Sequence, residues 1–480
     1  MMISAIPSVK KTLYAIGASC LFVISPLSSA DSLLEIYQKA LENDPQLKAD
    51  KANYDAGMEN KKIGLAGLLP SISGSVEHGR SDQESDGQTF AGGIPVGGGG
   101  LSKTDTLSTN YSVSLTQPLF DMGAWYSFQR GGVQSESAEV QFEADQQSFI
   151  IRVADAYFNV LRAIDGLETA TAEQRANESQ LEQAKQRFEV GLTPITDVHD
   201  AQAAFDGARA TTLDARGQVG IAYEALEVLT GSAEDAVLPL SGDFPVTNPT
   251  PASRSDWVDF ALENNYALKS AKLNAETSRL NAKVSASRHL PTLGLSATYS
   301  DRDSENDRTA YATNPPSSSK STSDSTSETT SIGVRLSIPI YSGGGTSAQR
   351  RQAYDQYLRA QELYNLQQRN TIQSARSLHL SVETSVATVN ARQQQIISST
   401  SALEATQAGY DAGTRTLVDV LLAQRTLYQA QRAYSDALYN YILNTLRLKE
   451  AAGNLSPEDI IELDRALDAA NPATRSSFEQ

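Results

Sequence analysis

The chain has 480 residues, of which 40% are apolar and 20% are charged, and its formal net charge is −17. Its single cysteine, Cys20, excludes an intramolecular disulfide and cysteine-ligated zinc. The acidity argues against nucleic acid as a partner. It suits a solvated surface, or a pore wall that attracts cations.

Residues 1–30 have the pattern of a secretory signal peptide. A lysine pair precedes an apolar stretch from Leu13 to Ile24, and small residues end at Ala30. An uncleaved anchor is the alternative, but the apolar stretch is shorter than the roughly 20 residues that span a bilayer. Cys20 is followed by apolar residues, which argues against a lipid-anchored cysteine. Cleavage would leave a mature chain without cysteine, with 38 basic and 57 acidic residues and a net charge of −19.

The sequence contains an internal repeat. Ala40–Asn43 (ALEN) returns as Ala261–Asn264, and Asp197 with Val198 returns as Asp419 with Val420 at almost the same displacement. An ordered series of such matches indicates a tandem duplication. The predicted parts are repeat 1 at 31–238, a Pro-rich linker at 239–255, repeat 2 at 256–455, and a short helix with a polar tail at 456–480.

Each repeat contains an alternating pattern typical of β-strands. Apolar and polar residues alternate from Leu107 to Gln117 and again around Ile332–Ile338, and partner strands begin after Pro70 and Pro291. We predict one β-hairpin per repeat, with strands of about ten residues, the length that crosses a bilayer when tilted. No segment after residue 30 approaches the length of apolar sequence that a membrane-spanning helix needs, so such a helix is excluded.

The strands of each predicted hairpin are separated by a polar insert. In the second insert, most of the residues from Ser317 to Ser331 are Ser or Thr, and we interpret both inserts as surface loops rather than disordered linkers. Phe120 and Tyr341 are candidate membrane-interface aromatics or ordinary core residues. Four prolines at the helix-side strand ends mark a barrel–helix junction, namely Pro70, Pro118, Pro291 and Pro339.

Long helices follow the strands. The segment from Thr346 to Ala408 lacks Gly and Pro, and the matching segment after Gly123 has no proline before Pro194. A helix of about 65 residues is roughly 100 Å long. Apolar residues at heptad spacing predict helix-on-helix packing. Two shorter segments flank each long helix, at 32–67 and 195–230 in repeat 1, and we expect them to run antiparallel to it, end to end.

Four strands cannot close a barrel, because closure needs about eight or more. Open sheet edges are not tolerated in lipid, so the chain must oligomerise there. The pattern alone permits two, three or four copies.

Four sequence runs resemble the TolC-type outer membrane factor family: Ala156–Leu161 (AYFNVL), Arg187–Leu192 (RFEVGL), Gly409–Val420 (GYDAGTRTLVDV) and Ala433–Tyr441 (AYSDALYNY). The resemblance implies a mainly α-helical chain with β-strands, a homotrimer with a twelve-stranded outer-membrane barrel, and a periplasmic helical barrel closed at its tip. It also implies the exit duct of multidrug efflux pumps and type I secretion. The implied partners are a periplasmic adaptor and an inner-membrane transporter of RND, ABC or MFS type, with no cofactor.

In this family, a polar network holds the tip closed, and its positions correspond here to Gln186, Thr196, Asp197, Tyr410 and Arg415. An acidic ring inside the tip corresponds to Asp419. The family's second ring falls on Leu422, so we expect weak binding of polyvalent cations. The alternative interpretation is local, because Thr416 with Asp419, and Thr193 with Pro194, also fit helix starts.

An enzyme is not indicated. The four histidines are scattered, no HExxH, GxSxG or P-loop pattern is present, and the glycine run Gly97–Gly100 lacks the Lys-Ser/Thr of a phosphate-binding loop. A periplasmic coiled-coil adaptor or a structural filament protein is the competing function, because long exported helices would serve either one. Neither explains four strands of membrane length.

Overall fold

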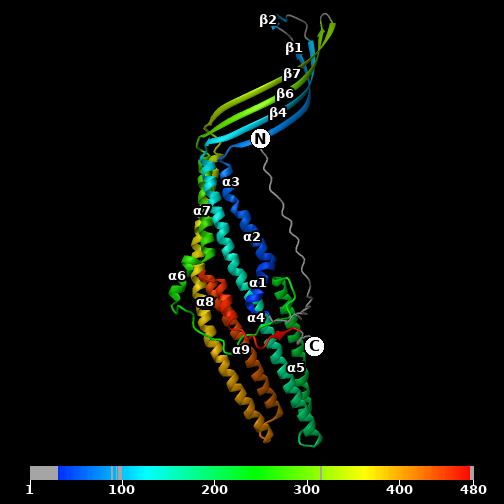
Figure 1. The fold of residues 1–480 in the computed structure, drawn as a ribbon, viewed down its shortest axis with the longest axis vertical. Coiled ribbons are helices and arrows are strands. Elements are labelled where there is room, and N and C mark those ends of the chain that lie inside the picture. Colours follow the sequence, from blue (N-terminus) through cyan, green and yellow to red (C-terminus); the bar gives the residue numbers. More distant parts are fainter. Residues whose placement is uncertain (1–30, 88–89, 93, 96–99, 314–315, 476–480) are drawn as a thin grey trace, which may run out of the picture.

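Long helices run away from a β-sheet that lies at one end of an elongated molecule (Figure 1). The computed structural model describes residues 31–87, 90–92, 94–95, 100–313 and 316–475. The signal peptide with Cys20, nearly all of the Gly97–Gly100 run and the end of the polar tail lie outside the described residues. No helix in the described ranges is long and apolar enough to cross a membrane.

The sheet has four antiparallel strands in the order β1-β4-β6-β7. They are β1 (Ser71–Gly87), β4 (Gly100–Phe120), β6 (Thr292–Thr313) and β7 (Pro316–Ser337). The hairpin β1–β4 and the hairpin β6–β7 are joined by pairing of β4 with β6. The short strands β2 (Phe90–Ala91) and β3 (Ile94–Pro95) pair with each other between β1 and β4.

The strands are longer than predicted, and the expectation of polar loops was wrong over most of both inserts. They have 17 to 22 residues, and the Ser/Thr-rich segment lies within β7. Polar side chains pair across the strands here, as in the 2.8 Å contact between the hydroxyls of Ser304 and Ser325. A sheet with polar residues on both faces is suited to water on both sides, so it lacks the alternation that reveals a half-buried strand.

The helical segment at 32–67 consists of three helices rather than one: α1 (Leu33–Asn43), α2 (Pro45–Met58) and α3 (Asn60–Ala66). Pro45 has no N–H to continue α1. The buried Asp44 carboxylate instead accepts hydrogen bonds from the N–H groups of Gln46 and Leu47, at 3.0 and 3.3 Å, and so begins α2. The break is a helix cap that redirects the chain.

The chain contains two long helices of nearly equal length, each followed by a shorter one. The helix α4 (Met122–Glu189) has 68 residues and α8 (Gly345–Asp411) has 67, while α5 (Ile195–Thr230) and α9 (Leu417–Ala452) each have 36. The shorter helices run antiparallel to the long ones, as predicted: α2, α3 and α5 lie along α4, and α7 (Tyr266–Ser287) and α9 lie along α8 (Figure 1). The helix α6 (Arg254–Asn264) also contacts α8.

The main hydrophobic core lies in the middle of the helical part. Tyr157 and Phe158 of α4 are fully buried in a cluster with α5 and α9 residues such as Leu226 and Ile442. The helix α10 (Pro457–Asp464) and the pair β5 (Ala236–Val237) with β8 (Ala473–Thr474) also cover this core. We call α1, the segment 234–255, α10 and β8 the collar. Ser456 is the N-cap of α10 and Pro457 its first residue.

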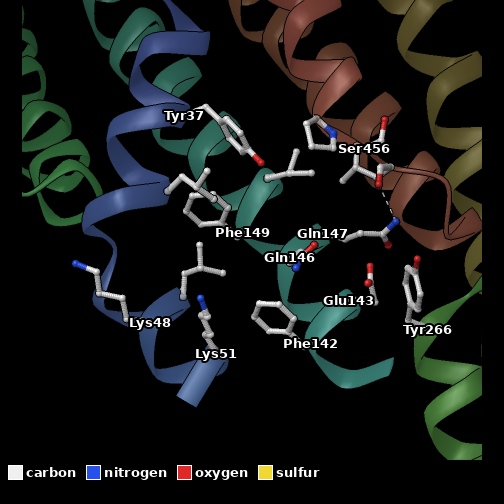
Figure 2. Close-up of a pocket in the computed structure, with 15 residues that line it drawn as sticks. Tyr37, Lys48, Lys51, Phe142, Glu143, Gln146, Gln147, Phe149, Tyr266 and Ser456 are labelled. Atoms are coloured by element: carbon white, nitrogen blue, oxygen red, sulfur yellow. Dashed lines mark hydrogen bonds between the residues drawn. The ribbon is translucent and has the colours of Figure 1, made fainter. Parts of the chain in front are cut away.

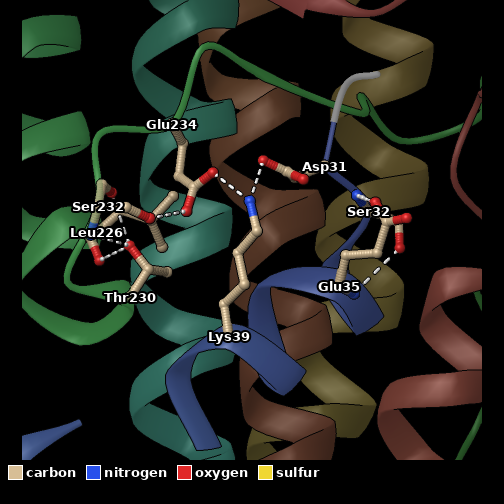
Figure 3. A network of polar contacts seen from close by, with 8 residues as sticks. All are labelled: Asp31, Ser32, Glu35, Lys39, Leu226, Thr230, Ser232 and Glu234. Atoms are coloured by element: carbon tan, nitrogen blue, oxygen red, sulfur yellow. Dashed lines mark hydrogen bonds and ion pairs between the residues drawn. The ribbon is translucent and has the colours of Figure 1, made fainter. Parts of the chain in front are cut away.

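The segment that begins at Asp31 is tied into the collar by a polar network (Figure 3). The Lys39 ammonium lies 2.7 Å from a carboxylate oxygen of Asp31 and 2.7 Å from one of Glu234, whose side chain is only 3% exposed. The Asp31 N–H also donates to the carbonyl of Ala236 at 2.9 Å. Burial, together with the nearby Asp31 carboxyl, raises the pKa of Glu234, while Lys39 acts in the opposite direction.

Candidate gate at the hairpin tips

The two helical hairpins end at the pole opposite the sheet (Figure 1). Both loops turn in the same way, through Gly191 with φ 76° and Gly413 with φ 72°, a left-handed conformation that favours glycine. The expected N-cap at Thr193 was wrong by one residue, because Pro194 occupies the cap position and α5 begins at Ile195. Thr416 caps α9 as predicted, with Asp419 completing a capping box.

A small apolar cluster joins the two hairpins just inside their ends. Its buried members come from all four long helices: Leu181, Ala184, Ala201, Tyr410, Leu417 and Val420. Tyr410 is only 6% exposed, yet its hydroxyl has no hydrogen-bond partner within the described chain. The tyrosine therefore contributes its ring to the cluster and leaves a polar atom available.

Arg187 forms a cation–π contact and an ion pair between the hairpins at this level. Its guanidinium lies 4.5 Å from the ring centroid of Tyr410, a cation–π arrangement, and 2.9 Å from the Asp411 carboxylate. The side chain of Arg187 is 32% exposed and that of Asp411 is 53% exposed. Partly solvated ion pairs of this kind contribute up to about 1 kcal/mol. The contact is therefore weak enough to be broken by a docking partner.

The structure brings the predicted network residues to the tips, but no hydrogen bond or salt bridge in the described residues joins any two of them. The Gln186 amide donates to Glu182 of the same helix at 3.1 Å. Thr196 is exposed at the start of α5, and Asp197 is half-buried one residue later. Neither side chain has a hydrogen bond to the second hairpin in the described residues.

Arg415 has no hydrogen bond or salt bridge to Asp197 inside one chain. Its backbone N–H donates to the Gly409 carbonyl at 3.2 Å, and its exposed guanidinium forms no salt bridge within the described ranges. The contact between arginine and aspartate that does join the hairpins uses Arg187 and Asp411 instead. Arg187 begins the run Arg187–Leu192, which resembles the family, but an arginine in the last turn of a helix gives no hint of its partner on the other hairpin.

Asp419 lies at the first turn of α9. Its carboxylate accepts hydrogen bonds from the Thr416 N–H at 3.0 Å and from the Thr416 hydroxyl at 2.9 Å. These hydrogen bonds, with a smaller contribution from the positive charge of Arg415, lower the pKa of Asp419. One turn further along, Leu422 is 62% exposed. The carboxylate is thus held in its charged form and has no second acidic residue at position 422.

The four prolines lie where the sheet meets the helices. Pro70 and Pro291 directly precede β1 and β6, Pro339 follows the end of β7, and Pro118 adjoins a register shift in β4. Beyond them, Phe120 is 47% exposed and Tyr341 is 86% exposed. Packing in the core of one protomer is therefore excluded for both rings.

A hollow lies beside the collar, between α1, α2, α4 and the start of α10 (Figure 2). It has a volume of about 600 Å³ and combines apolar walls, including Phe142 and Phe149, with Lys48, Lys51 and Glu143. No group of three or more potential metal-ligating side chains occurs within the described ranges.

The sheet has strands of 17 to 22 residues, which are long enough to cross a bilayer, and it is joined to helical hairpins of roughly 100 Å. This combination defines the class of outer-membrane channels with a periplasmic helical part. A model of the family described as "Outer membrane efflux protein" matches residues 36–232 and 257–454. The chain belongs to this family.

Known proteins support this assignment. The chain is 36% identical over 463 residues to the outer membrane protein TolC of Vibrio cholerae, covering 96% of this chain and 99% of the relative. It is 31% identical to the alkaline protease secretion protein AprF of Pseudomonas aeruginosa, covering 89% and 85%. The crystal structure of the outer membrane protein VceC from Vibrio cholerae has the same fold, with a TM-score of 0.69, 19% identity, and coverage of 88% and 96%.

Proposed function

We propose that the chain forms the exit duct of tripartite multidrug efflux pumps and type I secretion systems. It is an outer-membrane protein that extends into the periplasm. The observation that carries this function is the combination, in one chain, of membrane-length strands with two helical hairpins that end at the opposite pole (Figure 1). Similarity to TolC over nearly the whole chain and to a protease secretion protein supports both forms of export.

Three copies would close a twelve-stranded barrel. The edge strands β1 and β7 each have one side unpaired among the described strands of the protomer, and every residue of both is exposed. All pairs in the sheet are antiparallel, so β1 and β7 run in opposite directions and β7 of one copy can pair antiparallel with β1 of the next. Closure removes the open edges that lipid does not tolerate. We assign a homotrimer because the family resemblance implies that number.

We also propose that the chain arose by tandem duplication. The paired lengths of α4 with α8 and of α5 with α9 support it, as do the two matches of the family model on either side of residues 239–255. We retain repeat 1 at 31–238, the linker at 239–255 and repeat 2 at 256–455, preceded by a cleaved signal peptide at 1–30 and followed by 456–480.

The tips form the gate in this proposal. Inside each protomer, the gate is held by Arg187 with Tyr410 and Asp411. Between protomers, we assign the exposed Arg415 guanidinium to Thr196 or Asp197 of a neighbouring copy, because it forms no salt bridge in its own described chain. Gln186 completes the network, and Asp419 forms a single acidic ring. Docking of a periplasmic adaptor and an inner-membrane transporter would move the hairpins apart.

Single-channel recording tests the proposal. Purified mature protein in a planar bilayer should give a small, stable conductance, and Arg415→Ala combined with Tyr410→Phe should raise it markedly. Arg175→Gln on the exposed face of α4 is a matched control, because Arg175 has no salt bridge in the described chain. Correctly assembled protein without any conductance would refute the duct, and unchanged conductance in the double variant would refute the gate.

A further inference from the structure

The register of the sheet divides the strand residues into two faces, because residues directly opposite each other share a face. On β4, Tyr111, Val113 and Leu115 share a face with Val76 on β1 and with Tyr299 on β6. This apolar-bearing face must be the lipid side of a barrel, since barrel strands alternate apolar outward and polar inward. The other face, which carries Ser112 and Ser114, then faces the lumen.

Side-chain contacts agree with this division along the strands. Ser75 contacts Ser112, Ser114 contacts Thr298, and Ser304 contacts Ser325, all on the lumen face. The ion pairs between described strands all lie on the outer face: Arg80 with Asp105, Lys103 with Glu84, and Lys320 with Asp307. No hydrogen bond or ion pair between two side chains in the described part of the sheet joins residues assigned to opposite faces.

The charges of the strands are separated between these faces. The outer face carries ten carboxylates and three basic residues: Asp82, Glu84, Asp86, Asp105, Asp301, Asp303, Glu305, Asp307, Asp324 and Glu328, with Arg80, Lys103 and Lys320. The lumen face carries three arginines, Arg302, Arg308 and Arg335, and one carboxylate, Glu77. The remaining lumen-facing residues are mainly Ser, Thr, Asn and Gln.

The lumen arginines have no carboxylate partner within the described chain. Arg308 donates to the Ser102 hydroxyl at 3.0 Å, and none of the three arginines forms a salt bridge in the described ranges. Glu77 shares a row with Arg302 but is separated from it by β4, so the two lie about 10 Å apart across the sheet. The positive charge on the lumen face is therefore not neutralised locally.

We propose that Arg302, Arg308 and Arg335 give the barrel lumen a cationic lining that favours anions, while the outer face of the same strands is acidic. This inference rests on the proposed duct function. Arg335 lies level with Gly294 near the helix junction, and Arg302 and Arg308 lie progressively further from the junction along β6. Anionic groups on exported molecules, such as carboxylates and phosphates, would meet positive charge at three levels of the lumen.

The acidic composition of the chain suggested the opposite, a pore wall that attracts cations. The register explains the difference for the barrel, because most of the strand carboxylates face away from the lumen. The acidic ring at Asp419 lies at the other pole, so the two ends of the duct would select for opposite charges.

Neighbouring residues on opposite faces allow a direct test. Ser321 lies opposite Arg308 on the lumen face, and Thr322 lies opposite Asp307 on the outer face. Ser321→Cys and Thr322→Cys would be labelled in intact cells with an anionic and a cationic methanethiosulfonate, each rate being divided by that for a free thiol. We expect the anionic reagent to be preferred at position 321 and the cationic reagent at position 322.

Removing the charge of Arg308 tests whether this arginine causes the preference for the anionic reagent at position 321. In the Ser321→Cys protein, Arg308→Ser should lower the anion-to-cation rate ratio about fivefold, as expected for one unit charge about 7 Å away acting oppositely on the two reagents. Lys320→Ser is the matched control, because Lys320 is adjacent in sequence but faces outward. It should leave the ratio nearly unchanged.

Equal preferences at positions 321 and 322, or equal effects of Arg308→Ser and Lys320→Ser, would overturn the cationic lining and leave the duct intact. Labelling of both cysteines only after the cells are broken would instead contradict the proposed placement of the barrel in the outer membrane. The two failures are therefore distinguishable.

Discussion

The collar region and the hairpin tips are built on the same long helices but are held together very differently. The core at the collar contains 33 buried apolar residues, whereas the cluster at the tips contains six. Because each fully buried large side chain stabilises the fold by about 1.5–3 kcal/mol, the stability of the molecule is concentrated in its middle. The tips can separate without unfolding the helices that carry them.

The polar contacts at the collar and at the tips differ in the same way as the apolar ones. At the collar, the nearly buried Glu234 shares Lys39 with Asp31, and the network holds the segment that begins at Asp31 (Figure 3). At the tips, the partly exposed Arg187 holds Tyr410 and Asp411. The first arrangement fixes a position, and the second can be exchanged for contacts with water or a partner.

The largest effect is expected in the core. Phe158 has 0% of its surface exposed, and its ring lies 5.9 Å from that of Tyr439 on α9. Phe158→Ala should destabilise the protein by about 3–5 kcal/mol through cavity formation. Phe158→Leu, which keeps most of the volume, should cost less than about 1.5 kcal/mol. Thermal unfolding of the purified protein measures both, and equal losses would contradict the packing account.

Removal of Lys39 should have the next largest effect. Lys39→Ala leaves Glu234 buried without its cation, and we expect a loss of about 2–3 kcal/mol near neutral pH, reduced because the Lys39 side chain is 39% exposed. The pKa of Glu234 is already raised by burial, so the loss should shrink as the pH falls and the carboxyl becomes protonated.

Unfolding of Lys39→Ala over a series of pH values checks this prediction. Adding Glu234→Gln removes the unpaired charge and should restore much of the stability at neutral pH. A loss of unfolding free energy that is independent of pH and unaffected by Glu234→Gln would show that Lys39 acts through packing alone.

At the tips we expect a smaller loss of stability but a measurable change in channel conductance. Arg187→Gln removes both the cation–π contact and the ion pair with Asp411, a total of about 1 kcal/mol. Single-channel conductance should rise while the thermal unfolding midpoint stays close to that of the wild type. Arg175→Gln, on the same helix, should change neither, and a large fall in the midpoint for Arg187→Gln would assign the residue to folding rather than gating.

The smallest effect concerns the acidic ring that we propose at Asp419. Hydrogen bonds from Thr416 lower the pKa of Asp419, so its charge and its capping contribution should be complete above the ordinary carboxyl range and be lost only as the pH falls through the lowered pKa. Weak current block by a trivalent cation should therefore be constant between about pH 5 and about pH 8. Asp419→Asn should abolish the block, and Leu422→Asp should strengthen it.

The sequence predicted the helices better than the strands. Two local signals, the absence of proline and the heptad spacing, located α4, α5, α8 and α9. The internal repeat supported the same four helices. The outer halves of the strands were missed because Ser and Thr occupy both faces of β7, and no alternation distinguishes such a strand from a loop. Its pairing with β6 depends on a register between two segments, which local patterns do not reveal.

The site residues show the same limit. The position of Asp419 in a capping box was predictable from Thr416, which precedes it by nearly one helical turn. The partnership of Arg187 with Tyr410 was not, because the two residues lie in different helical hairpins and meet only after both hairpins have formed. Residues that act between copies, as we propose for Arg415, carry even less local information.

The near equality of the two hairpins has a consequence for symmetry. The helices α4 and α8 differ in length by one residue, and this difference offsets their ends by only about 1.5 Å. A trimer would thus present six almost equivalent ends, arranged with threefold symmetry in detail and close to sixfold symmetry in outline. A periplasmic partner with either three or six copies would find matching positions on that rim.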